Sequence, residues 1–203
     1  MLKAILFDFD GVLTLDATGS QTICNYICKE TGIDKQLFTK EYKKYNTDLL
    51  YGKLKHEDIW GEVCAAINTD ISIEVLRASF INTPINEDML NLIKELKSRA
   101  YKTAMVTDNK KDRIDKVVEY YNLDTVFDAV TVSAEVGSGK DKEAIFIKTM
   151  ERLNVSANEC VFIDNQKGNL IVPKQMGMEV IFYDHEEKDV GKLINQLMAL
   201  GIY

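Results

Sequence analysis

Short apolar runs alternate with amphipathic helical patterns along most of this chain. The runs are rich in β-branched or aromatic residues and predict strands at 3–8, 102–107, 126–132, 160–164 and 179–183. Helical periodicity separates them and predicts helices from Asn86 onward and at 110–121, 141–153, 168–176 and 189–200. Strands that alternate with helices in this way favour a parallel sheet with helices on its faces.

Residues 15–85 break this alternation. Helical spacing follows helical spacing there, with Ile23 and Ile27 on one predicted helix and Ile59 and Val63 on another. The segment is too long for an ordinary crossover or a structureless loop, so it predicts a separate helical domain inserted after the first strand. Its hinges are expected near 15–18 and 82–86.

The predicted fold class is therefore α/β, a Rossmann-like parallel sheet flanked by helices, with an inserted α-helical cap domain. Residues 1–15 and 86–203 are expected to form the α/β core domain, and residues 16–85 the cap domain.

The end of the first predicted strand carries two aspartates, Asp8 and Asp10, followed by Gly11 and Thr14. Side chains alternate along a strand, so both carboxylates project to the same side where the strand ends. Two carboxylates held so close repel each other unless a cation or a proton lies between them. This pair is the strongest chemical signal in the chain.

Other strand ends supply matching groups. Thr107 and Asp108 end the second predicted strand, Asp164 ends the fourth, and Lys140 precedes the helix after the third. Ligands of open α/β sheets gather at the carboxyl ends of the strands, so these side chains are expected around one crevice. Carboxylate oxygens suit Mg²⁺, while hydroxyl and ammonium groups suit a phosphoryl group.

Composition narrows the classes of function. The chain has 203 residues, of which 46% are hydrophobic and 28% charged, and its net charge is −7. This acidic balance, without a long basic run, argues against nucleic acid or an anionic membrane as a partner. The apolar stretches are shorter than a membrane-spanning helix requires. The first residues enter a predicted strand with no signal or transit segment before it, so a cytoplasmic protein is expected.

Cysteine and histidine do not form a metal-binding or catalytic pattern. The cysteines, which lack metal-site spacing and are expected as small core residues, are Cys24, Cys28, Cys64 and Cys160. His56 and His185 are far apart in sequence and are expected at the surface. Trp60 is expected in the core of the cap. The lysines expected to form a solvated face of the cap are Lys40, Lys43, Lys44, Lys53 and Lys55.

Taken together, the strand-end motifs resemble those of the haloacid dehalogenase-like superfamily. The similar segments are Asp8-Phe9-Asp10-Gly11-Val12-Leu13-Thr14, Val106-Thr107-Asp108-Asn109, Val136 to Lys140 with Ile145-Phe146, and Val161-Phe162-Ile163-Asp164-Asn165 with Asn169 and Gly177. The inserted helices resemble the first-position cap of that superfamily. Tyr51-Gly52-Lys53 and Asp58-Ile59-Trp60 further resemble its small-capped sugar-phosphate phosphatase branch.

The resemblance implies a Mg²⁺-dependent phosphatase that acts on a small phosphorylated metabolite, a sugar phosphate being one candidate. Asp8 would be the nucleophile that forms an aspartyl-phosphate, and Asp10 would move the proton of the leaving oxygen. Mg²⁺ would be held by the carboxylates of Asp8 and Asp164 and by the backbone carbonyl of Asp10. Thr107, the Asp108 N–H and Lys140 would hold the phosphoryl oxygens. A monomer or a homodimer is expected.

Three positions depart from the pattern of the family. Asn165 stands where many members have a second aspartate, and Asp108 stands where asparagine is commoner. Asp141 and Glu143 replace prolines that usually stiffen the lysine segment. The alternatives left open are a phosphomutase that uses the same phosphoenzyme, a carbon–halogen hydrolase, and a non-catalytic binding protein with the same fold. The general acid at Asp10 argues against the carbon–halogen hydrolase.

Overall fold

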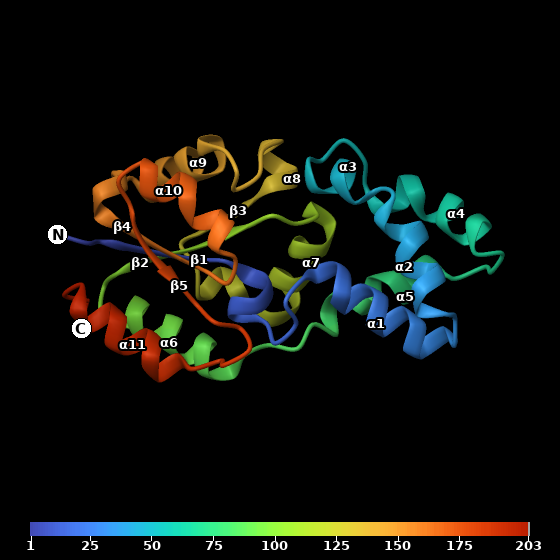
Figure 1. The fold of residues 1–203 in the computed structure, drawn as a ribbon, viewed down its shortest axis with the longest axis horizontal. Coiled ribbons are helices and arrows are strands. Elements are labelled where there is room, and N and C mark those ends of the chain that lie inside the picture. Colours follow the sequence, from blue (N-terminus) through green and yellow to red (C-terminus); the bar gives the residue numbers. More distant parts are fainter. Residues whose placement is uncertain (203) are drawn as a thin grey trace.

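The sheet lies at the centre of the larger part of the molecule (Figure 1). A computed structural model describes residues 1–202. Its strands are β1 (Ala4–Phe7), β2 (Lys102–Thr107), β3 (Ala129–Val132), β4 (Cys160–Asp164) and β5 (Glu179–Phe182). They form one sheet in the order β3-β2-β1-β4-β5, and every neighbouring pair is parallel. The predicted α/β fold with a parallel sheet is confirmed.

The register of the central strands brings the predicted site residues together. Phe7 at the end of β1 lies opposite Met105 of β2 and Ile163 of β4. The backbone N–H of Asp8 then donates to the carbonyl of Ile163 at 2.9 Å. Asp8 therefore reaches the same edge of the sheet as the last residues of both neighbouring strands.

Both faces of the sheet are covered by helices because the strands alternate apolar side chains between them. Ile5 and Phe7 of β1 belong to one core cluster, whereas Ala4 and Leu6 belong to another. The first face is covered by α6 (Glu87–Ser98), α7 (Lys111–Tyr121) and α11 (Val190–Ala199), and the second by α9 (Glu143–Leu153) and α10 (Ile171–Gln175). Short elements complete this part: α8 (Ser133–Val136), η2 (Leu123–Thr125), η3 (Ala157–Glu159) and η4 (Lys167–Leu170).

Local sequence explains where α6 begins. The side chain of Asn86 accepts a hydrogen bond from the Met89 N–H at 3.2 Å, so Asn86 is the predicted N-cap. Glu87 and Asp88 follow in the first turn, where negative charge is favourable. Met89, Ile93 and other residues at helical spacing are then buried against the sheet.

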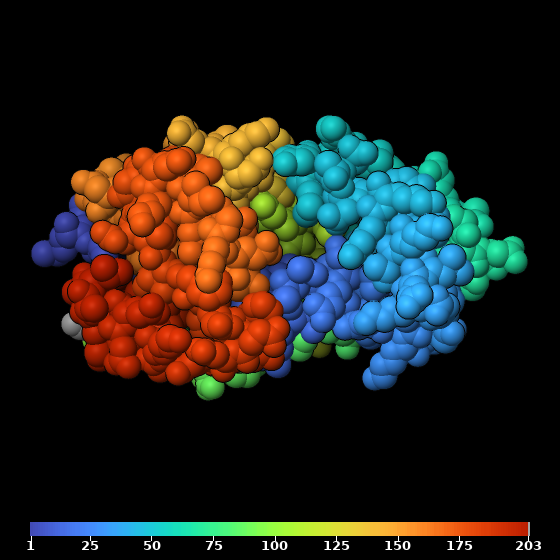
Figure 2. Space-filling view, viewed as in Figure 1, coloured from blue at the N-terminus to red at the C-terminus, as the bar shows by residue number. Residues whose placement is uncertain are grey.

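A helical insertion follows β1, as predicted. It consists of α1 (Gly19–Thr31), α2 (Lys35–Lys43), α3 (Asn46–Leu50), α4 (His56–Ala66) and α5 (Ile73–Ile81). These helices share a separate apolar core that includes Phe38, Tyr42, Trp60 and Phe80. Figures 1 and 2 show the insertion at one end of the molecule, against the edge of the sheet-bearing part.

Two connecting segments join the insertion to the sheet-bearing part side by side. Thr14 and Ile85 form an antiparallel β-bridge. On either side of it the Leu15 N–H donates to the Pro84 carbonyl at 2.8 Å, and the Asn86 N–H donates to the Leu13 carbonyl at 2.9 Å. The chain thus leaves and re-enters the sheet-bearing part at one place.

The side-chain expectations hold with two exceptions. Trp60, Cys24, Cys64 and Cys160 are buried, but Cys28, which is also expected in the core, is only half-buried. The lysines predicted as a solvated face of the insertion, which are Lys40, Lys43, Lys44, Lys53 and Lys55, are exposed. Among the described residues, no helix has the length and apolar character needed to cross a membrane.

The prediction that His56 lies at the surface is wrong. Its side chain is only 1% exposed. Both ring nitrogens have partners, the Tyr42 hydroxyl and an Asp112 carboxylate oxygen, each at 2.7 Å. The imidazole can be buried because these partners satisfy its polar atoms, and one of them lies on α7, outside the insertion.

Two predicted elements have different bounds. The strand expected at 126–132 begins only at Ala129, because residues 126–128 form an irregular turn that follows η2. The helix expected at 168–176 is divided into η4 and α10, with Pro173 inside α10. Proline cannot donate the backbone hydrogen bond of a regular helix, which fits the break in geometry.

Candidate active site

The turn after β1 holds Asp8 and Asp10 in fixed positions. This turn, η1 (Phe9–Leu13), begins where an oxygen of Asp8 accepts the Phe9 N–H at 2.6 Å. Gly11 has a φ of +81°, a left-handed backbone conformation that favours glycine. Its N–H donates to the Thr14 hydroxyl at 3.0 Å. The glycine and the threonine of the first motif therefore serve the shape of the turn that presents the two carboxylates.

Lys140 lies between two buried carboxylates. Its Nζ is 2.8 Å from an oxygen of Asp8 and 2.7 Å from an oxygen of Asp164, and the lysine is only 1% exposed. Asp164 also accepts the N–H of Gln166 at 2.6 Å. The competing lysine of the same loop, Lys142, is exposed.

These contacts set the protonation of the site. Burial raises the pKa of Asp8 well above its ordinary range, and the ammonium of Lys140 offsets only part of this effect. Burial also acts to lower the pKa of Lys140, but the carboxylates of Asp8 and Asp164 outweigh it and raise that pKa. One cation thus faces two carboxylates, which leaves the site rich in negative charge.

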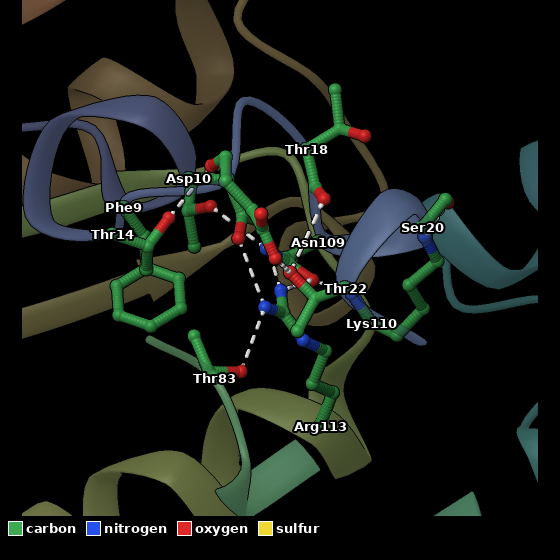
Figure 3. Close-up of polar contacts among 12 residues, drawn as sticks. Phe9, Asp10, Thr14, Thr18, Ser20, Thr22, Thr83, Asn109, Lys110 and Arg113 are labelled. Atoms are coloured by element: carbon green, nitrogen blue, oxygen red, sulfur yellow. Dashed lines mark hydrogen bonds and ion pairs between the residues drawn. The ribbon is translucent and has the colours of Figure 1, made fainter. Parts of the chain in front are cut away.

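Asp10 is held by an ion pair with Arg113 of α7 (Figure 3). Nη1 and Nη2 of the guanidinium donate to the two carboxylate oxygens at 2.8 and 2.9 Å. The Asn109 side chain adds a third hydrogen bond to Asp10 at 2.7 Å. Arg113 is fully buried and also donates to the Thr83 hydroxyl at 3.3 Å, so it links the end of the insertion to the turn that carries Asp10.

Arg113 was not singled out from the sequence. It lies within the helix predicted at 110–121, where a charged residue is normally taken as part of the solvated face. The sequence signal that could have identified Arg113 is its position in the first turn of the helix that follows Thr107 and Asp108, which places it near the edge of the sheet where the site lies.

The second motif contributes Thr107 and Asp108. The Thr107 hydroxyl is buried and accepts from the Asn109 side chain at 3.2 Å. The Asp108 carboxylate accepts the backbone N–H of Lys140 at 3.0 Å, which directs it toward the lysine loop. Burial raises the pKa of Asp108, although the positive charge of Lys140 opposes the shift.

A cavity of about 350 Å³ joins these residues to the helical insertion. Its walls from the sheet-bearing part include Asp8, Asp10, Thr107, Asp108, Asn109, Lys110 and Lys140, and its walls from the insertion and its connection include Ala17, Thr18, Gly19, Ser20, Lys43 and Asn46. A second cavity of about 970 Å³ lies between the insertion and α7 and does not reach Asp8 or Asp10. The chemistry of the smaller cavity makes it the candidate active site despite its size.

The oxygen donors around Asp8 fit a hard divalent cation. Within residues 1–202 there is no cluster of three or more His, Cys, Asp or Glu side chains arranged for a metal. A site here would instead combine the carboxylates of Asp8 and Asp164 with carbonyl oxygens, which is a normal donor set for Mg²⁺. The buried side-chain oxygen of Asn165 has no hydrogen-bond partner in the described part of the chain. This orphaned oxygen belongs to the residue that follows Asp164, and its side chain lies against Gly11 of the turn that carries Asp10, so it fits this purpose.

Comparison with known proteins agrees with the geometry. The chain is similar to bifunctional epoxide hydrolase 2 of Rattus norvegicus, with 26% identity in an alignment that covers 89% of this chain and 36% of that protein. It is similar to phosphoserine phosphatase of Methanocaldococcus jannaschii, with 25% identity in an alignment that covers 89% of this chain and 85% of that one. The chain thus spans about a third of the first relative and most of the second.

Solved structures support the fold. A haloacid dehalogenase family enzyme from Bacteroides thetaiotaomicron, in complex with magnesium and inorganic phosphate, superposes with a TM-score of 0.73 at 17% identity. The match covers 90% of this chain and 94% of that one. The haloacid dehalogenase-like hydrolase family model matches residues 2–177. The chain therefore belongs to the haloacid dehalogenase-like hydrolases, the family and enzyme class that its motifs predict.

Proposed function

We propose that this hydrolase is a Mg²⁺-dependent phosphatase that acts on a small phosphorylated metabolite through an aspartyl-phosphate at Asp8, with a sugar phosphate as one candidate substrate. The observation that carries the proposal is the placement of Lys140 between Asp8 and Asp164 beside a small polar cavity. The phosphoserine phosphatase among the relatives, and the magnesium and phosphate in the Bacteroides structure, support it.

In this proposal the Asp8 carboxylate attacks phosphorus, and the bond from phosphorus to the leaving oxygen breaks. Lys140, the Thr107 hydroxyl and the Asp108 N–H hold the phosphoryl oxygens while the phosphoryl group passes to the Asp8 carboxylate. Water then attacks phosphorus, the bond between phosphorus and the Asp8 oxygen breaks, and inorganic phosphate and the free carboxylate are released. Asp8, Asp164, the Asp10 carbonyl and the Asn165 side-chain oxygen would hold Mg²⁺, which when bound supplies positive charge against the phosphoryl dianion.

Asp10 is the proposed proton carrier, first to the leaving oxygen and then from the attacking water. In the structure both of its carboxylate oxygens accept hydrogen bonds from Arg113. A carboxylate held in this way cannot donate a proton, so the reaction requires Asp10 to exchange at least one bond to Arg113 for the leaving oxygen. The helical insertion is the proposed cap that excludes water while this happens.

The test is single-turnover release of inorganic phosphate from p-nitrophenyl phosphate, with and without Mg²⁺. We expect Asp8→Asn to lower the rate by at least about 1,000-fold, because the amide keeps the shape of the side chain and removes the nucleophile. Asp124→Asn, at an exposed position in η2, is the matched control and should retain the wild-type rate.

The outcomes separate the proposal from its rivals. Near wild-type turnover by Asp8→Asn would show that Asp8 is not the nucleophile. An isomerised phosphorylated product without free phosphate, in a screen of sugar phosphates, would indicate a phosphomutase. No hydrolysis by the wild-type protein with any divalent cation would leave a binding protein with this fold.

A further inference from the structure

Lys110 is a buried cation in the catalytic cavity that the proposed chemistry does not use. It is only 4% exposed, and its Nζ donates to the Ser20 hydroxyl at 3.0 Å. In the described part of the chain no carboxylate forms an ion pair with it. A buried ammonium normally has an anionic partner, because a lone hydroxyl compensates poorly for the lost water.

The other charges of the cavity are already engaged. Asp10 is paired with Arg113, and Asp8 is paired with Lys140. Asp108 accepts the backbone N–H of Lys140. Lys43, on the insertion, adds a second positive side chain to the cavity wall. Positive charge is therefore in excess on the side of the cavity where Lys110 meets the insertion.

The N-terminus of α1 reinforces this excess. Thr18 caps the helix by accepting the Gln21 N–H, and Gly19 and Ser20 occupy the first two positions of α1. The N–H groups of these positions have no acceptor within a helix, and the helix dipole makes this end positive. Figure 3 shows the side chain of Lys110 extended to Ser20, apart from the contacts between Asp10 and Arg113.

The electrostatics of Lys110 agree with a missing anion. Burial lowers its pKa to about 8, and the positive charge of Arg113 contributes to the shift, while the carboxylates of Asp10 and Asp112 oppose it without forming an ion pair with Lys110. An anion bound beside Nζ would favour the protonated lysine and relieve this destabilisation.

We propose that Lys110, Ser20 and the N-terminal amides of α1 bind a second anionic group of the substrate. The substrates would be phosphate monoesters whose leaving group carries a carboxylate or a second phosphate. The phosphoryl group to be removed lies at Asp8, and the second anion lies against Lys110, within a cavity of about 350 Å³ that admits only a small molecule. This inference rests on the proposed phosphatase activity.

The experiment compares three substrates that share a two-carbon leaving group. Phosphoglycolate carries a carboxylate, ethane-1,2-diol bisphosphate carries a second phosphate, and 2-hydroxyethyl phosphate is neutral at that end. Release of phosphate gives kcat and KM for the wild type, for Lys110→Met, and for Lys111→Met. Lys111 is the matched control because it is exposed and paired with Asp115.

We expect Lys110→Met to raise KM for at least one anionic substrate by about 10- to 100-fold, because this is the loss of affinity expected when a hydrogen bond to a charged group is removed. Turnover of the neutral substrate should change by less than about 3-fold, and Lys111→Met should affect neither class. The substrate that loses affinity identifies the anion as carboxylate or phosphate. An equal loss on neutral and anionic substrates, or no preference for an anion in the wild type, would overturn the inference.

Binding to the Asp8→Asn variant separates this inference from the proposed function. Calorimetry with the same three compounds in Mg²⁺ should show tighter binding of an anionic compound, and Lys110→Met in that background should remove the difference. If no compound is hydrolysed but this selectivity is found, the phosphatase proposal fails and the anion site stands. Equal affinities for all three compounds would reject the anion site whatever the activity.

Discussion

Gly19, the first residue of α1, lies against the ion pair between Arg113 and Asp10. A Cβ at this position would approach Nη1 of Arg113 to 2.2 Å and an oxygen of Asp10 to 2.9 Å. The guanidinium has little freedom to move away, because it also donates to Asn109 and Thr83. Close approach of the insertion to the catalytic turn therefore requires a glycine here.

We expect Gly19→Ala to reduce kcat by about 10- to 100-fold, because displacement of Arg113 moves Asp10, and small misplacements of catalytic groups are costly. Gly61→Ala is the control: Gly61 lies in α4 with open space around it, so alanine there should leave kcat unchanged and stabilise the helix by up to about 1 kcal/mol. Steady-state phosphate release and thermal unfolding of both variants check this. Unchanged kcat in Gly19→Ala would mean that the ion pair can shift freely.

Lys110 gives the free energy of unfolding a defined pH dependence. Its pKa is about 8 in the folded protein and 10.5 when unperturbed, so the unfolded chain binds more protons in this range. The charged lysine is therefore destabilising below pH 8, and the penalty declines as the pH rises toward 10.5.

Lys110→Met should accordingly be more stable than the wild type by on the order of 3 kcal/mol near pH 7, and this advantage should shrink as the pH rises toward 10. Urea unfolding of both proteins across this range measures the difference, with Lys111→Met as the reference for an exposed lysine. A difference that does not vary with pH would show that Lys110 is not the titrating group.

At the scale of elements, α7 connects the insertion to the catalytic turn. Asp112 binds His56 of α4, Arg113 binds Asp10 after β1, and Tyr121 donates its hydroxyl to carbonyls in the connecting segment 81–83. Burial alone would raise the pKa of Asp112, but the hydrogen bond and electrostatic interaction with His56, together with the backbone N–H groups of Arg113 and His56, outweigh it and lower that pKa. One helix therefore contacts both the insertion and Asp10, the proposed proton carrier.

A double-mutant cycle on His56 and Asp112 tests this connection. His56→Ala and Asp112→Ala should each lower the free energy of unfolding, and their coupling energy should be about 1–3 kcal/mol because the pair is largely buried. The exposed pair Arg77 and Glu57, within the insertion, should couple by less than about 1 kcal/mol. Equal coupling in the two pairs would contradict a structural role for the His56 contact.

The difference between α6 and α7 shows what could be predicted at this scale. The apolar spacing of α6 and its N-cap Asn86 are local signals, and both were predicted. The burial of Arg113 and His56 was not, because each depends on a partner far away in sequence, Asp10 and Asp112 respectively. Local patterns assign a charged or polar helical residue to the solvated face unless such a partner is known.

For the whole molecule, the parallel sheet and the site edge follow from the alternation of strands and helices, together with the rule that ligands gather at strand ends. That is why Asp8, Thr107 and Asp164 could be grouped from sequence alone. The choice of Lys140 over Lys142 rested on its spacing to Ile145 and Phe146, and the structure places Lys140 against Asp8. The contacts between the insertion and the site could not be inferred, since no sequence pattern sets the angle between two separately packed cores.

The charge balance of the site couples the stability of the whole chain to the proposed metal. Two buried carboxylates share one ammonium, and Asn165 adds a neutral oxygen. Asn165→Asp would add a third negative charge, so we expect a lower Tm without metal and a larger rise in Tm on adding Mg²⁺. Thermal unfolding and activity across a Mg²⁺ titration measure this. An unchanged titration would place position 165 outside the metal site.

The bridge between Thr14 and Ile85 has a consequence for how such a protein can diversify. Because the two connecting segments run side by side, the first and last residues of the insertion are neighbours. Over residues 1–202, no strand of the sheet pairs with a residue of the insertion, so the sheet does not depend on which helices the insertion contains. A different set of helices could occupy the same junction without a change in the phosphate chemistry. Under the proposed function, this joint would allow substrate preference to change through the insertion while the proposed reacting carboxylates stay the same.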